Sequence, residues 1–360
     1  MYNTKIKWKI FQMYTITNDG SVVDDNGKVI FFSVERFVKD ICEGDCCFIC
    51  GASPSDVKFN NEHILPEWIL KKYDLYSKTI NLPNETIFKY AQYKIPCCLG
   101  CNSLMGKVFE RPFRELVNKG YKAFTEYIEN NGFTFLLNWL AIIFLKTHLK
   151  DKSLRINLDT REKAGNIADF YNWEELYHIH CVARSFYTKC KLDPKIQGTL
   201  YILPAEVSDE FEEFDYIDIY AAKTMLLRLG NIAIIHVLDD SCAVMNLHFD
   251  TLKKITRPLS HLQLRELTAT FAHANMDLIE RPRFYSEFDR VSNTCKIMAD
   301  IPEKMKFVDF DPQKYGSIMH YCFKDFIQAI PSTERTTIES HIKKGDYTFL
   351  FDEDGNLINQ

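Results

Sequence analysis

The chain has 360 residues, of which 46% are hydrophobic and 14% aromatic. This composition is typical of a folded globular protein and excludes an intrinsically disordered chain, which would lack enough apolar residues to form a core. The formal net charge of −5 excludes a strongly basic nucleic-acid-binding protein, so any contact with nucleic acid must use local basic patches. The length suits two domains, or three small ones, better than a single core.

The N-terminal sequence MYNTKIKWKIFQMY mixes lysines with aromatic residues. A signal peptide would instead have an apolar core followed by small residues. The longest apolar run, residues 133–145, is interrupted by Asn138 and is shorter than the ~20 residues that a membrane span needs. We therefore expect a cytoplasmic protein that does not enter a membrane, and a buried helix at this run.

Residues 12–32 predict two strands joined by a turn at the DDNG sequence of residues 24–27, which is a strong hairpin signal. A short helix is expected over residues 34–41. The following stretch, residues 42–54, contains four cysteines and two glycines and ends in Ser53 and Pro54, so regular structure is not expected there. Something other than a hydrophobic core must hold this stretch in place.

A helix is expected from Asn102 to just before Gly120, with a kink at Pro112, because apolar residues recur there at helical spacing. Those apolar residues are Met105, Phe109, Phe113 and Leu116. Beyond it, the patterns predict one or two helices over 121–150, mixed strands with helix over 178–250, a helix over 260–278 and an irregular tail.

Four of the 12 cysteines form two C-x2-C pairs, Cys47 with Cys50 and Cys98 with Cys101. Each pair can turn both thiolates onto one ion, and four thiolates around Zn²⁺ would hold a segment that has little other support. A C-x3-C register that uses Cys46 is an alternative. The cysteines adjacent to the pairs are Cys42, Cys46 and Cys97, and those expected in the core are Cys181, Cys190, Cys242, Cys295 and Cys322.

The sequence between and after the pairs resembles the HNH endonuclease family. The resemblance covers residues 45–117 and consists of C-x2-C, then the E-H-I-L-P-E-W sequence of residues 62–68, then C-x2-C followed by Asn102. Glu110, eight residues after Asn102, adds to the similarity with bacterial HNH proteins, many of which belong to restriction or anti-phage systems. The resemblance implies a ββα-metal module, similar to a treble clef, with a structural zinc.

Hydrolysis of a phosphodiester needs a base to activate water and a cation to neutralise charge on the phosphate. His63 is the candidate base, because an unperturbed histidine pKa of ~6.5 leaves the ring largely neutral at physiological pH. Glu62 and Asn102 are the candidate ligands of the catalytic ion. Their oxygens suit Mg²⁺ or Mn²⁺ rather than a second zinc.

The middle asparagine of the family pattern has no unique counterpart here, and Asn81 and Asn84 are both candidates. Lys107, Arg111 and Arg114 follow the motif and could contact substrate phosphates, although a solvated helix face is an equal alternative.

We expect an α+β protein with two parts. Residues 1–120 would hold the hairpin and the HNH module, and residues 121–360 a larger mixed α/β domain for partner binding, sensing or assembly. The expected function is hydrolysis of DNA with one divalent ion in a bacterial anti-phage or restriction effector. An RNase, for example one acting on tRNA, and a non-catalytic zinc-stapled binding module are the alternatives. Expected partners are DNA or RNA and a protein such as an ATPase or a sensor subunit.

Overall fold

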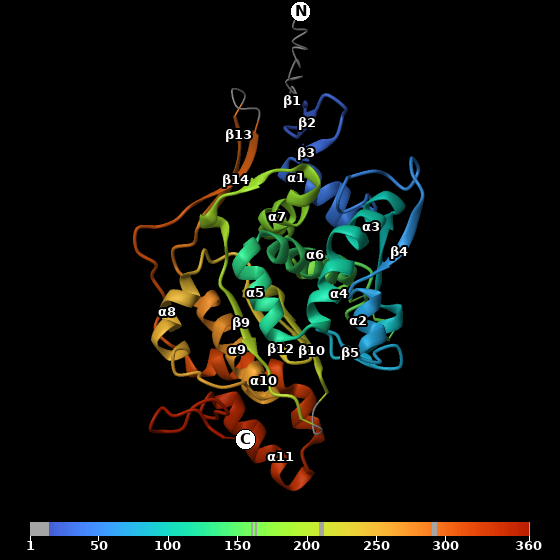
Figure 1. The fold of residues 1–360 in the computed structure, drawn as a ribbon. Helices are drawn as coiled ribbons and strands as arrows, with labels where there is room; N and C mark the ends of the chain where they lie inside the picture. The colour runs from blue at the N-terminus through green and yellow to red at the C-terminus, as the bar shows by residue number, and fades with distance from the viewer. Residues whose placement is uncertain (1–13, 160, 163, 209–211, 290–293, 360) are drawn as a thin grey trace, which may run out of the picture.

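The computed structural model describes residues 14–159, 161–162, 164–208, 212–289 and 294–359 (Figure 1). The N-terminal sequence considered above, with residues 12 and 13 of the expected first strand, therefore lies outside the described residues, apart from Tyr14. The next elements are β1 (Tyr14–Ile16), β2 (Val22–Asp24), β3 (Val29–Phe31), α1 (Val34–Arg36) and a π-helical segment (Phe37–Glu43). They confirm the expected turn at residues 24–27 and a short helical stretch after it, but three strands form where two were expected, and most of that stretch is π-helical.

The hairpin turn is organised by Asp24. Its carboxylate accepts hydrogen bonds from the backbone amides of Asn26 at 2.9 Å and Lys28 at 3.0 Å. Aspartate commonly caps turns in this way. β2 pairs antiparallel with both β1 and β3, giving a three-stranded sheet.

Two paired strands followed by a long helix form the unit that carries the sequence motif. Its elements are β4 (Phe59–His63), α2 (Glu67–Lys72), β5 (Thr79–Asn81), β6 (Ile87–Lys89), β7 (Lys94–Cys98), α3 (Leu99–Met105), a π-helical segment (Gly106–Glu110) and α4 (Arg111–Asn118). β4 pairs antiparallel with β7, and Phe59 lies opposite Cys98. The helix expected from Asn102 is confirmed. Pro112 is the second residue of α4 and lies just after the π-helical segment, and the helical backbone continues through it.

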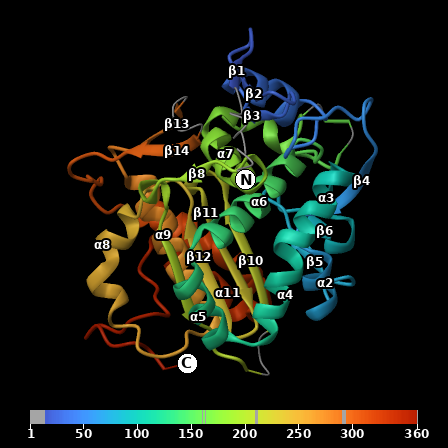
Figure 2. The same cartoon turned by 45° about the horizontal axis from the view of Figure 1, so that its top comes forward.

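A four-stranded antiparallel sheet lies at the centre of the molecule (Figure 2). Its strands are β9 (Leu200–Pro204), β10 (Phe214–Ile219), β11 (Thr224–Leu229) and β12 (Ile232–Val237), in the order β10-β11-β12-β9. Alternate residues enter two cores: Leu227 and Ile234 pack into one, and Leu226 and Ile235 into the other. Because both faces are covered, these strands appear in the sequence as continuous apolar runs.

Helices cover both faces of this sheet. The first core contains side chains from α5 (Tyr121–Asn131), α6 (Thr134–Asp151) and α7 (Tyr177–Thr188), and the second from α9 (His261–Asp277) and α10 (Pro312–Ala329). The first core also contains residues of β3, β7 and α4. The motif-bearing unit and α6 therefore share one hydrophobic core.

The expectation of an irregular tail is wrong. After residue 278 the chain forms β13 (Arg283–Asp289), β14 (Thr294–Asp300), α10 and α11 (Ser332–Lys344). The elements not yet described are β8 (Lys191–Leu192), α8 (Ala243–Leu252) and the 3-10 turns Tyr90–Gln92, Ile167–Phe170, Trp173–Leu176, Pro194–Ile196 and Tyr220–Ala222. β13 pairs antiparallel with β14, and β14 pairs parallel with β8. This second pairing joins segments about a hundred residues apart, which local periodicity does not reveal.

The apolar run of residues 133–145 forms part of α6, which is buried along almost its whole length. Asn138 is satisfied inside it, because its amide donates to the Val182 carbonyl and the Ser185 hydroxyl, both at 2.6 Å. Among the described residues, no single helix has both the length and the apolar character to cross a membrane; α5 and α6 pass this test only as a pair bent by 112°.

Phe113 links α4 to α6, and its removal should destabilise the protein strongly. Its fully buried ring stacks on Phe135 at 4.3 Å and on Trp139 at 4.1 Å between ring centroids. We expect Phe113→Ala to lower the free energy of unfolding by about 3–5 kcal/mol in urea denaturation. Phe170→Ala is the control, because its ring is 75% exposed and its loss should cost within about 0.5 kcal/mol. Equal losses for the two variants would contradict this packing.

Candidate metal centre and active site

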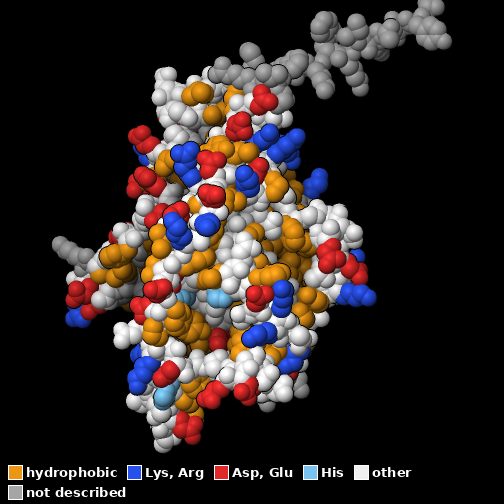
Figure 3. Space-filling view, turned by 90° about the vertical axis from the view of Figure 1, so that its left-hand side faces the viewer, with side chains coloured by type: hydrophobic (Ala, Val, Ile, Leu, Met, Phe, Trp, Pro, Cys, Tyr) orange, Lys and Arg blue, Asp and Glu red, His pale blue; other side chains and the backbone are white. Residues whose placement is uncertain are grey.

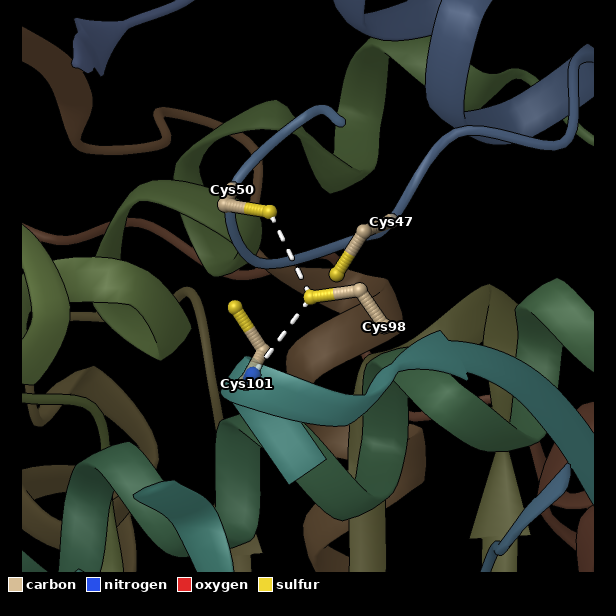
Figure 4. A group of neighbouring side chains, drawn as sticks. All are labelled: Cys47, Cys50, Cys98 and Cys101. Atoms are coloured by element: carbon tan, nitrogen blue, oxygen red, sulfur yellow. Dashed lines mark hydrogen bonds between the residues drawn. The ribbon is translucent and has the colours of Figure 1, made fainter. Parts of the chain in front are cut away.

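Four cysteines converge from two distant parts of the chain (Figure 4). The Sγ atoms of Cys47, Cys50, Cys98 and Cys101 all lie within 4.8 Å of one another. Cys47 and Cys50 belong to the turn before β4, whereas Cys98 ends β7 and Cys101 lies in the first turn of α3. This geometry selects Cys47 over the alternative Cys46, which is not a member of the group.

Backbone geometry shapes both cysteine turns. The amide of Gly51 donates to the Cys47 carbonyl at 2.8 Å, and the amide of Cys101 donates to the Cys98 sulfur at 3.4 Å. Gly51 has a φ of +77°, and a Cβ there would come within 2.5 Å of the Phe32 ring. Glycine is therefore required at this turn, on both conformational and steric grounds.

The four thiols can hold a metal ion. Hydrogen bonds from the Cys101 and Cys50 thiols lower the pKa of Cys47, and the resulting thiolate raises the pKa of Cys101. Ionisation of one thiol in the group therefore makes ionisation of the next thiol less favourable. A divalent cation removes this opposition, because it stabilises all of the thiolates that bind it.

Glu62 and Lys146 form a buried ion pair at the other end of β4. The Lys146 ammonium lies 3.1 Å from Glu62 Oε1 and donates to the His63 carbonyl at 2.7 Å. The two side chains are 9% and 3% exposed, respectively. Lys146 comes from α6, so the acid–histidine pair of the motif is held by a helix 84 residues away in the chain.

Glu110 completes this cluster from the last position of the π-helical segment. Burial raises the pKa of Glu110 to about 7, and a hydrogen bond with Glu62 adds to the rise, while Lys146 opposes it. Two carboxylates in contact share a proton or a cation, because their like charges disfavour simultaneous ionisation. Lys146 supplies one positive charge to this pair.

His63 lies half-buried at the end of β4. Burial lowers the pKa of its ring, and Lys94 lowers it further. Nε2 is screened from solvent and has no hydrogen-bond partner among the residues that the structure describes. The Tyr76 ring stands edge-on to the histidine, with 6.4 Å between centroids. This environment favours the neutral ring and leaves one nitrogen uncommitted.

The asparagines of the sequence motif occupy different surroundings. Asn102 lies in the first turn of α3 next to Cys101, about 12 Å before Glu110 along the helix. Within the described part of the chain, no hydrogen bond joins Asn102 to Glu62. Asn81 donates to Asp325, and Asn84 donates to the Arg155 carbonyl at 2.7 Å. Their amides therefore hold the β5–β6 hairpin against later parts of the chain.

A cavity of about 580 Å³ opens between α2 and α4. Its charged and polar lining consists of Lys71, Lys72, Arg111, Arg114, Glu67, Glu110 and Asn118. Arg111 and Arg114, both expected from the sequence as phosphate contacts, thus lie beside the Glu62–Glu110 pair, whereas Lys107 does not line the cavity. Within the described ranges, neither arginine forms an ion pair.

Sequence reasoning missed Lys146, Lys71 and Lys72. Lys146 directly follows the apolar run of residues 133–145 on a helix that stays buried beyond it. A lysine in such a position needs a buried partner, because an isolated buried charge is costly. That signal predicts a carboxylate contact, but it does not identify Glu62.

Comparisons of the chain with families of known proteins, with curated protein sequences and with solved structures found no match. Function is therefore inferred from the residues and their geometry alone.

The cysteine group should bind metal, with about one ion per chain after gel filtration, measured by inductively coupled plasma mass spectrometry. Cys101→Ser should lose this ion and melt at a lower temperature. Cys322→Ala, a buried cysteine outside the group, should keep the ion and cost ~1 kcal/mol, as ordinary core changes do. Freshly purified protein without metal, or Cys101→Ser with undiminished metal, would overturn the assignment.

The Glu62–Lys146 pair should show strong coupling. Lys146→Met leaves a buried carboxylate without its cation, and removing one partner of a buried pair costs about 3–5 kcal/mol. The double variant Glu62→Gln/Lys146→Met should lose less than the two single variants combined, as measured by urea denaturation. Strictly additive losses would show that the two groups do not interact.

Proposed function

We propose that the protein is a metal-dependent nuclease of the HNH type that hydrolyses phosphodiester bonds in DNA. One observation carries the proposal: Glu62 and His63 end a strand whose partner, β7, leads directly into the helix that returns Glu110 to Glu62. A cavity lined by four basic side chains adjoins this carboxyl pair. The cavity would accept a phosphate group beside the motif residues.

The cysteine group would hold a structural zinc, since four thiolates favour tetrahedral Zn²⁺. Its part is to fix the turn before β4 relative to β7 and α3. Glu62 and His63 lie three and four residues along β4 from Phe59, which faces Cys98, so the metal would set the frame without taking part in the reaction.

His63 is the proposed general base. Its lowered pKa keeps the ring neutral at physiological pH, and Nε2, although screened from bulk solvent, would accept a proton from a water molecule that enters the site with the substrate. The hydrogen bond from Lys146 to the His63 carbonyl holds the backbone of the base. Lys146 is therefore a positioning residue in this scheme.

Glu62 and Glu110 would hold the catalytic ion, either Mg²⁺ or Mn²⁺, because paired carboxylates suit a hard divalent cation. The ion, when bound, supplies neutralisation of charge on the phosphate and the leaving oxygen. Asn102, the ligand expected from the sequence, is the alternative partner of Glu62, and the contact between Glu62 and Glu110 favours the carboxyl pair.

Arg111 and Arg114 would bind the phosphates that flank the scissile bond, with Lys71 and Lys72 on the facing wall. Guanidinium groups match phosphate oxygens in pairs, and such contacts supply much of the affinity for nucleic acid. Figure 3 shows the face on the left of Figure 1, away from α2 and α4, where basic, acidic and hydrophobic side chains are interspersed.

His63→Ala should abolish cleavage without disturbing the fold. Loss of a positioned base typically slows a reaction by ~10²- to 10⁴-fold, so nicking of supercoiled plasmid should become undetectable. Metal content and melting temperature should match the wild type, because His63 is not a member of the cysteine group. His320→Ala, a partly exposed histidine on α10 that pairs with Glu339, is the matched control and should cleave normally. A fully active His63→Ala protein would contradict the role of base.

A second pair of variants identifies the ion ligand. We expect Glu110→Gln to lower cleavage strongly and to recover part of it at high Mn²⁺, because the substitution weakens ion binding and leaves the base in place. Asn102→Ala should lose less activity under the same conditions. The reverse ranking in a metal titration would assign the ion to Glu62 and Asn102.

A further inference from the structure

A second cavity, of about 340 Å³, lies near the C-terminal end of α6. It shares no lining residue with the cavity between α2 and α4. Its volume falls within the ~300–1,000 Å³ range of small-molecule sites. Most of its wall is apolar or aromatic, with Ile156, Ile167 and Ile219 beside Tyr171, Tyr220 and Tyr321, and its polar wall includes His148 and Asp218.

His148 stands between two buried aspartates at this polar wall. Its Nδ1 lies 3.4 Å from Asp151 Oδ2, and its Nε2 lies 3.5 Å from Asp218 Oδ2. His148 and Asp151 are each 1% exposed, and Asp218 is 13% exposed because it borders the cavity. Across the described residues, both ring nitrogens and Asp151 Oδ1 have no hydrogen-bond partner. Buried polar atoms without partners are rare in proteins and call for an explanation.

The charges around the cavity favour a cationic ligand. Two carboxylates face one imidazole, and no lysine or arginine is among the lining residues. The Lys324 ammonium, whose charge lowers the pKa of Asp218, donates to the Leu82 carbonyl at 3.3 Å. Burial raises the pKa of Asp218 to about 6, so its negative charge lacks full compensation. An anionic ligand would be repelled by these carboxylates.

A metal ion fits less well than an organic cation. The two nitrogens of His148 face different carboxylates, so its ring and the two aspartates do not direct three donor atoms at one point. The aromatic faces are also occupied: Tyr220 stacks on Tyr171 at 3.8 Å, and the Lys223 ammonium lies 4.5 Å over the Tyr220 ring. A ligand would therefore place its apolar body against isoleucine side chains and ring edges, with its polar head at Asp218.

We propose that this cavity binds a small organic cation, with an apolar body in the isoleucine-lined part and an ammonium or amidinium head that donates to Asp218. The head would supply the positive charge and the N–H groups that the buried carboxylate lacks. The site is independent of the proposed nuclease chemistry, because Asp218 and His148 take no part in it.

Calorimetric titration of the full chain with three probes that share a phenyl ring tests this proposal. Benzamidine is the cation, benzyl alcohol the neutral probe and benzoate the anion. Benzamidine should bind and raise the melting temperature, whereas benzoate should do neither. A charge-assisted hydrogen bond is worth ~10- to 100-fold in affinity, so Asp218→Asn should weaken benzamidine binding by that factor. Asp300→Asn, at an exposed carboxylate on β14, should bind like the wild type.

Ile156→Trp is a second variant, which fills the cavity and leaves Asp218 in place. It should block benzamidine while keeping the circular dichroism spectrum of the wild type, so the proposal stays testable even if Asp218→Asn fails to fold. Benzoate binding as tightly as benzamidine, wild-type affinity in Ile156→Trp or in a folded Asp218→Asn, or no benzamidine binding at millimolar concentration would each overturn the proposal.

Discussion

The convergence of four cysteine sulfurs is the constraint on which the rest of the candidate site depends. The turn that carries Cys47 and Cys50 has almost no regular secondary structure, so its position relative to β7 and α3 must be fixed by the sulfurs and by a few backbone hydrogen bonds. Four thiols so close together cannot all ionise without a cation. A bound metal ion would stabilise the thiolates and would crosslink the turn before β4 to the end of β7 and the start of α3.

A buried charge cluster forms the second constraint and ties the motif to the rest of the chain. Lys146 contacts Glu62 and the backbone of His63 from α6, and Glu110 contacts Glu62 from the π-helical segment. Residues two apart on a helix point in roughly opposite directions, because each residue turns about 100°. α6 thus presents Lys146 to the candidate active site and His148 to the cavity near its C-terminal end. Both clusters depend on one helix whose apolar residues pack into the shared core.

Local signals in the sequence predicted those parts of the fold that local interactions determine. The turn at residues 24–27, the two cysteine pairs and the helical spacing over residues 260–278 each depend on neighbours within a few residues, and all three are present in the structure. The strand pairing of β14 with β8 and the contact of Lys146 with Glu62 join distant segments, so periodicity and motif spacing could not reveal them. The same holds for Asn81 and Asn84, whose amides bond to Asp325 and Arg155 rather than to a motif residue.

Phosphate contacts position a nucleic acid without distinguishing one sugar from another, so the same residues can act on DNA or RNA. The proposed hydrolysis of DNA with a divalent ion is tested most directly by mixing supercoiled plasmid with the purified wild-type protein. We expect nicked product with Mg²⁺ or Mn²⁺, no product during brief EDTA treatment, and a structural metal that is retained throughout. Plasmid left intact by a folded, metal-loaded protein in both ions would contradict it, and cleavage of RNA alone would transfer the same site to a different substrate.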